Sequence, residues 1–136
     1  MIVVDTNVIV YLFLPGEHTA TARRAFERDP AWVAPLLWRS EYRNVLATSL
    51  QRGHLEIDDA VEVMDLASEL MDGREYAVDS NGVLRLAQES GCSAYDCEFV
   101  ALARELGIPL VTADRRVHSS FRNVTIRLTE FGGERS

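Results

Sequence analysis

The most informative absence from this sequence is lysine. The chain has 136 residues, and all 14 of its basic residues are arginine. Without lysine it cannot form a Schiff base, place a Walker-type lysine on a phosphate, or supply the lysine of a receiver-domain phosphorylation site. These three chemistries are therefore excluded.

Positive charge, cysteine and long apolar runs are also scarce. The net charge of −7 has the wrong sign for a protein that holds nucleic acid by a general basic field, so any such role requires local arginine clusters or metal ions. Cys92 and Cys97 belong to no wider pattern, which indicates buried, inert thiols in a reduced, cytoplasmic setting. No stretch reaches the run of about 20 apolar residues that crosses a bilayer, and the first residues lack the basic segment of a signal peptide.

The length and the hydrophobic content favour one compact domain. Hydrophobic residues make up 47% of the chain, which is enough for a substantial core. We expect a single domain over residues 1–131, followed by a flexible tail at 132–136 with the sequence GGERS.

Short apolar segments alternate with amphipathic helical ones along the chain. Strands are predicted at 2–5, 32–35, 76–79, 108–112 and 124–128, and helices at 17–29, 36–52, 58–71 (with Asp58 as N-cap), 80–89 and 93–106, with a helix or turn at 7–14. This alternation predicts an α/β fold of three layers, in which helices cover both faces of a central parallel sheet of about five strands.

Two acidic residues follow predicted strands. Asp5 comes directly after the apolar residues IVV, and Asp114 lies just past the strand IPLVT. In a parallel sheet, ligands gather outside the carboxyl ends of the strands. An aspartate in this position is also a common helix N-cap or turn residue, and for either residue taken alone that interpretation is favoured.

A third acid lies on the apolar face of a predicted helix. Glu41 is four residues after Leu37 and four before Val45, so the three side chains share one face. A carboxylate in the middle of a helix on an apolar stripe is costly unless something neutralises it. Capping does not explain this residue.

Asp96 shares the apolar face of the later helix. It lies three residues before Phe99 and four before Val100, and Ser93-x-x-Asp96 also matches a capping box. Because the chain has no lysine and its arginines are scattered, a divalent cation is the most economical neutraliser of these acids. Several carboxylates without a histidine and cysteine ligand set favour a hard ion, Mg²⁺ or Mn²⁺.

Three blocks of sequence then resemble a known family. VVDTNV (3–8), SEYRNVL (40–46) and YDCEFVALARELGIPLVTAD (95–114) are similar to the corresponding segments of PIN-domain ribonucleases, in particular VapC-like toxins of toxin–antitoxin pairs. The first block alone is weak, whereas all three in order, covering nearly the whole chain, make a strong match. The resemblance implies a three-layer α/β/α PIN-like domain.

The resemblance also implies an acidic pocket. Its catalytic residues would be Asp5, Glu41, Asp96 and Asp114, with Asp5, Asp96 and Asp114 as ligands of one or two Mg²⁺ or Mn²⁺ ions. Polar residues that would orient ligands or water are Thr6, Asn7 and Thr112. Arginines near the acids in sequence, some of which could clamp the RNA backbone, are Arg39, Arg43, Arg115, Arg116 and Arg122. A solvated or partner-binding arginine is an equally good interpretation of each. The stretch RRVHSS, with Val117, lacks the further acid or aromatic residue that many relatives carry, which weakens the case for a full second metal site.

The function implied is metal-dependent hydrolysis of RNA by a cytoplasmic homodimeric toxin, paired with a VapB-like antitoxin. The candidate apolar surface for a partner is formed by residues 11–14 with the helix at 57–71. One alternative keeps the fold as a catalytically inactive binding or scaffold module. A metal-dependent phosphatase is the other, although a haloacid-dehalogenase-like enzyme would require aspartate where Asn7 stands and a lysine later. A dinucleotide-binding domain is excluded because no G-x-G-x-x-G follows a strand.

Overall fold

The structure, a computed structural model, describes residues 1–133 of the chain, and its centre is a five-stranded parallel sheet. The strands are β1 (Ile2–Val4), β2 (Trp32–Pro35), β3 (Glu75–Tyr76), β4 (Leu110–Thr112) and β5 (Thr125–Arg127). Their order in the sheet is β3-β2-β1-β4-β5. The predicted parallel α/β sheet is therefore confirmed, although most of the strands are shorter than the apolar segments that predicted them.

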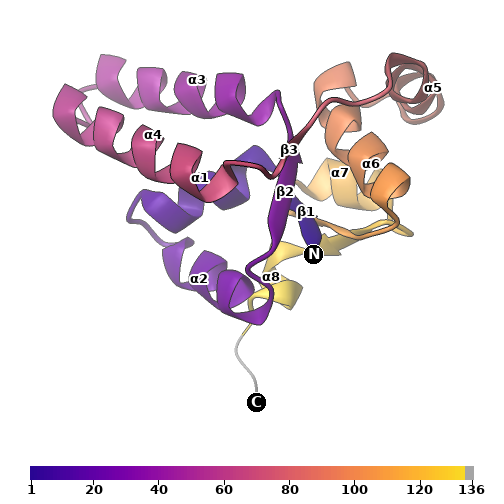
Figure 1. Ribbon diagram of the computed structural model, residues 1–136, viewed down its shortest axis with the longest axis horizontal. Coiled ribbons are helices and arrows are strands. Elements are labelled where there is room, and N and C mark those ends of the chain that lie inside the picture. The colour runs from indigo at the N-terminus through magenta and orange to yellow at the C-terminus, as the bar shows by residue number, and fades with distance from the viewer. Residues whose placement is uncertain (134–136) are drawn as a thin grey trace.

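Eight helices among the described residues cover this sheet. They are α1 (Thr6–Phe13), α2 (Thr19–Arg28), α3 (Trp38–Gln51), α4 (Ile57–Met71), α5 (Ser80–Ser90), α6 (Ala94–Leu106), α7 (Arg115–Ser120) and α8 (Leu128–Phe131). Figure 1 shows α1 to α4 on one side of the sheet and α5 to α7 on the other, which is the predicted three-layer arrangement. Within residues 1–133, no helix is both long and apolar enough to cross a membrane.

The helix boundaries follow local capping, with one correction. The helix predicted to have Asp58 as its N-cap begins at Ile57, with Glu56 in the N-cap position, two residues earlier than predicted, and no side-chain cap bond. Asp58 lies instead in the first turn, where a carboxylate interacts favourably with the helix dipole. Gly107 ends α6 with a φ of 66°, in the left-handed region that favours glycine.

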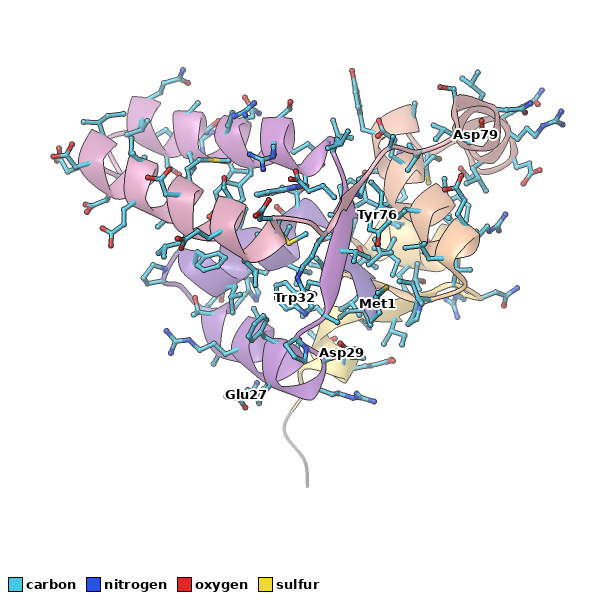
Figure 2. All side chains as sticks on the ribbon, in the orientation of Figure 1. Met1, Glu27, Asp29, Trp32, Tyr76 and Asp79 are labelled. Carbon is cyan, nitrogen blue, oxygen red and sulfur yellow. The ribbon has the colours of Figure 1, made fainter. Side chains whose placement is uncertain are left out.

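The core lies between the sheet and both helical layers. All three residues of β1 are buried, because helices cover both faces of the central strand. Val3 pairs with Val33 of β2 and with Leu110 of β4. Trp32, the first residue of β2, is fully buried (Figure 2). Its ring meets that of Phe26 of α2 edge to face, with the ring centroids 5.3 Å apart. This packing fixes the carboxyl end of β1 in the middle of the sheet.

The start of the chain is anchored beside the end of α2. The amino group of Met1 donates to a carboxylate oxygen of Asp29 at 2.7 Å, and Figure 2 shows the two labelled residues close together. The two predicted inert cysteines, Cys92 and Cys97, are both buried and free.

The described end of the chain packs on α2. Gly132 is buried, and its carbonyl accepts a hydrogen bond from Arg24 Nε at 2.6 Å. Gly132 therefore packs against α2. Residues 134–136 of the predicted tail lie outside the described residues.

Candidate active site

The strand order places a ligand-binding crevice beside β1. In the sheet, β2 and β3 lie on one side of β1, whereas β4 and β5 lie on the other, so the direction in which successive strands are added reverses at β1. Ligands of open parallel sheets bind at such a reversal, outside the carboxyl ends of the strands. Asp5 follows β1 and Asp114 follows β4, so both acids lie at the reversal point.

All four predicted acids line one pocket of about 410 Å³ at this edge of the sheet. Asp5 and Asp114 come from the strand ends, Glu41 from α3 and Asp96 from α6. Figure 1 shows α3 and α6 on opposite sides of the sheet, so both helical layers contribute to the pocket. The predicted polar residues Thr6, Asn7 and Thr112 also line it.

Asp5 is held by three donors and serves two purposes. One carboxylate oxygen accepts from the Val8 amide at 3.2 Å and thereby caps α1. The other accepts from the Thr112 hydroxyl at 2.5 Å and from the Ala113 amide at 3.1 Å. Burial raises the pKa of Asp5 to about 6, against the lowering effect of these hydrogen bonds, and the charge of Asp114 adds to the rise. The capping interpretation of Asp5 is confirmed, and the same carboxylate still faces the pocket.

Thr112 connects the two strand-end acids. Its hydroxyl donates to Asp5 and accepts from the Asp114 amide at 3.0 Å. Asp114 in turn caps α7, because one of its carboxylate oxygens accepts from the Val117 amide at 2.9 Å. This network fixes the loop after β4 relative to Asp5.

Glu41 faces the pocket from the start of α3. The prediction that it lies in the middle of a helix was wrong: α3 begins at Trp38, two residues later than the predicted 36, so Glu41 belongs to the first turn. The hydroxyl of Thr6 donates to Glu41 Oε1 at 2.7 Å. Burial raises the pKa of Glu41, the Thr6 hydrogen bond opposes this, and the charge of Asp96 increases it.

Asp96 has half of the predicted capping box. The Ser93 hydroxyl accepts from the Asp96 amide at 3.1 Å, but the described residues contain no return bond from the Ser93 amide to the carboxylate. The carboxylate is therefore available to the pocket. Its pKa is raised by burial and by the charge of Asp114, whereas the charge of Arg116 lowers it.

The donor set of the pocket fits a hard cation. Among the described residues, no arginine, histidine or cysteine lines the pocket, so its polar atoms are carboxylate, hydroxyl, amide and backbone groups. In the described part of the chain, no three His, Cys, Asp or Glu side chains form a ready cluster that could hold a metal ion. Mg²⁺ commonly keeps several waters and binds through one or two carboxylates, so such a cluster is not required.

The arginines predicted to touch RNA lie outside the acidic pocket. Arg39 donates twice to the Glu75 carboxylate, at 2.6 and 2.8 Å, and this ion pair occupies its guanidinium. Arg43 is exposed on α3. Arg116 donates to the Gly91 carbonyl at 2.8 Å.

Arg115 and Arg122 have different surroundings. Arg122 is exposed in the turn between α7 and β5. Arg115 is exposed at the start of α7 and lines a second, smaller cavity next to the acidic pocket.

Sequence reasoning missed three polar residues of the pocket lining: Ser40, Asn44 and Tyr95. Helical spacing could have found the first two, because Asn44 lies four residues after Ser40 and three after Glu41. Tyr95 precedes Asp96 and is 63% exposed, and a single exposed aromatic residue gives no periodic signal.

Comparisons with known proteins concern the family and the fold of the chain. A family model described as PIN domain matches residues 2–125. Ribonuclease VapC3 from Pyrobaculum aerophilum is 30% identical over 123 residues, which cover 88% of this chain and 94% of that protein. The crystal structure of PAE2754 from Pyrobaculum aerophilum superimposes with a TM-score of 0.75 at 20% identity and covers 97% of this chain and 96% of that one. At that identity the structural likeness concerns the fold alone.

Proposed function

The chain belongs to the PIN domain family, and from this membership we propose that it is a metal-dependent endoribonuclease that hydrolyses RNA phosphodiester bonds. The predicted resemblance to PIN-domain, VapC-like ribonucleases is confirmed by the family match and by the 30% identical relative. The observation that carries the proposal is the convergence of four acids from four elements on one pocket. Three of them have a raised pKa, chiefly because they are buried and to a smaller extent because each lies near another carboxylate.

Asp5, Asp96 and Asp114 are the residues that would hold Mg²⁺ or Mn²⁺. Bound there, a divalent cation would lower the pKa of a water molecule and offset charge on the phosphate. Cation binding would also relieve the repulsion among these carboxylates.

The chain's own residues orient the reacting groups. Thr112 fixes Asp5 through its hydroxyl, and Thr6 fixes one oxygen of Glu41. The other Glu41 oxygen, on a partly buried carboxylate of raised pKa, is suited to accept a proton from water in the pocket and return it to the leaving group. Asn7 is exposed at the pocket and offers an amide to the substrate.

We further propose that the enzyme is the toxin of a cytoplasmic toxin–antitoxin pair, acts as a homodimer and binds a VapB-like antitoxin. The support is the relative named ribonuclease VapC3. Exposed apolar side chains on α4 offer a partner surface, with Ile57 61%, Val61 52% and Leu66 42% exposed. The solution mass of the purified protein tests the dimer: a strict monomer without an associated peptide would contradict this part of the proposal.

An RNA cleavage assay tests the activity. The purified protein is incubated with a mixed RNA pool in Mg²⁺ or Mn²⁺, with and without chelator, alongside Asp5→Asn and Asp96→Asn. The matched control is Asp65→Asn, which makes the same change at an exposed acid of α4. We expect metal-dependent cleavage that both site variants abolish and that the control retains.

Two results would point to the alternatives. If metal binding is measured by calorimetry but the RNA stays intact, the domain is a binding or scaffold module. If a phosphate monoester is hydrolysed while RNA is not, the protein is a metal-dependent phosphatase. Cleavage that the site variants retain would indicate a contaminating nuclease and reject these carboxylates as the catalytic groups.

A further inference from the structure

A second cavity of about 180 Å³ adjoins the acidic pocket. The two cavities share Thr112 and Asp114, so the loop after β4 forms a common wall between them. Tyr11 and His18 also line the second cavity, together with Arg115 and Arg127. A strand of substrate lying across the wall would therefore pass directly from one cavity to the other.

The two cavities differ in charge. Four carboxylates and no described basic side chain line the first, whereas two guanidinium groups and one carboxylate, that of the shared Asp114, line the second. Arg127 is the last residue of β5 and pairs in register with Thr112 of β4, so the sheet itself places it beside the wall. Arg115 follows Asp114 and begins α7 on the same loop.

Both arginines are available to a ligand. Each is exposed, and within residues 1–133 neither one makes a salt bridge or a side-chain hydrogen bond. They differ in this from Arg39, whose guanidinium is paired with Glu75, and from Arg116, which is bound to a carbonyl. Two free guanidinium groups around one small cavity suit a phosphate, because each group can donate two parallel hydrogen bonds to its oxygens.

Aromatic rings complete the cavity. The rings of Tyr11 and His18 pack with centroids 4.6 Å apart at an interplanar angle of 40°. Tyr11 is half-buried and His18 is the more exposed of the two. Basic groups combined with aromatic rings are the surroundings in which single-stranded nucleic acid binds without sequence preference.

We propose that Arg115 and Arg127 form a phosphate subsite that holds the RNA backbone at the phosphate next to the one cleaved. This inference rests on the proposed ribonuclease function and assigns the binding of the polyanion to the second cavity. It accounts for RNA binding by a chain of net charge −7, because two guanidinium groups lie directly beside the acidic pocket. The subsite contacts phosphate, so it positions the strand without reading its sequence.

The test compares Arg115→Gln and Arg127→Gln with Arg52→Gln. Arg52 is exposed at the end of α3 and lines neither cavity, so this control makes the same charge change elsewhere. Binding of a short fluorescent single-stranded RNA is measured in Mg²⁺ over a salt series, in an Asp96→Asn background that prevents cleavage. We expect each subsite variant to weaken binding about tenfold and to reduce the slope of log affinity against log salt by about 0.7.

A second measurement separates positioning from a general loss of charge. With Asp96 intact, a dinucleotide that contains a single phosphate should be cleaved equally by wild type and by all three variants, because no second phosphate is present. A longer RNA should show a raised KM in the two subsite variants and an almost unchanged kcat.

The outcomes of the two proposals are distinguishable. If Arg52→Gln weakens RNA binding as much as the subsite variants do, or if the subsite variants bind RNA as wild type does, the subsite is rejected. If the subsite variants bind RNA more weakly and wild type cleaves nothing, the two arginines bind the RNA backbone, but the nuclease proposal fails and so does the placement of the subsite beside a cleaved phosphate.

Discussion

Replacing Thr112 by valine is expected to destabilise the protein through the loss of one hydroxyl group. The Thr112 side chain is 1% exposed, so water cannot easily replace the hydroxyl. Valine keeps the shape of the side chain but removes the donor to Asp5 and the acceptor for the Asp114 amide. The perturbation is therefore confined to the network that joins the two strand-end acids.

The size of the effect follows from the charge on Asp5. A hydrogen bond to a charged group contributes about 1.5–3 kcal/mol, and the Asp114 amide adds less because that residue is exposed and can bond to water. The Thr112 hydroxyl lowers the pKa of folded Asp5, which burial raises to about 6. Removing the hydroxyl moves this pKa still higher above its unfolded value. The variant then loses unfolding free energy over a wider range of rising pH than wild type does. The stability difference between wild type and the valine variant should therefore be larger at pH 8 than at pH 5.

Urea unfolding of wild type, Thr112→Val and Thr112→Ser at pH 8 and pH 5, with chelator present, measures this. Serine keeps the hydroxyl and loses one buried methyl group, which should cost about 1 kcal/mol at both pH values. The valine variant should lose about 2 kcal/mol at pH 8 and clearly less at pH 5. A valine variant as stable as wild type at pH 8, or a deficit independent of pH, would refute this account of Asp5.

Three further predictions concern the site and the end of the domain. Burial raises the pKa of Asp5 from 3.8 to about 6, so between these pH values the folded protein binds more protons than the unfolded chain. As the pH rises through this range, metal-free wild type should therefore lose up to about 3 kcal/mol of unfolding free energy relative to Asp5→Asn. Parallel profiles of unfolding free energy against pH for the two proteins would contradict this prediction. Glu41→Gln should lower RNA cleavage about 10²-fold or more. Its melting temperature should not fall, because burial already disfavours the ionised form of Glu41. Equal losses of activity and stability would argue for a structural role of this residue. Gly132→Ala should cost about 1–3 kcal/mol, because a Cβ atom there would lie 2.2 Å from the Thr21 carbonyl oxygen, whereas Gly16→Ala, with nothing within 4 Å, should leave thermal unfolding unchanged.

The main elements could be predicted because their residues carry periodic or capping signals. The apolar run before Asp5 predicted a strand buried on both faces, and β1 is buried throughout. Ser93 predicted the start of α6, and Gly107 predicted its end. The helices α7 and α8 were not predicted, because six and four residues are too few to show a helical period.

The candidate site was predictable in its residues but not in its bonding. Parallel strands bring their carboxyl ends to one edge, so acids placed after strands meet there whatever the detail of the loops. Sequence alone could not distinguish Arg39 from Arg115. The guanidinium of Arg39 forms an ion pair with Glu75, whereas Arg115 has no such partner among the described residues and is free to bind a ligand. That distinction depends on which side chains meet after folding.

By itself, then, the sequence determined the α/β class, the order of the longer elements and the four acids that line one pocket. Local pattern sets these, because strand, helix and cap preferences act over a few neighbouring residues. Only the tertiary structure decided which hydroxyl groups hold Glu41 and Asp5. The bond from Thr6 to Glu41 spans 35 positions and the bond from Thr112 to Asp5 spans 107, and no local rule specifies such contacts. The same long-range pairing placed Arg127 beside Thr112 and so created a basic cavity next to the acidic one.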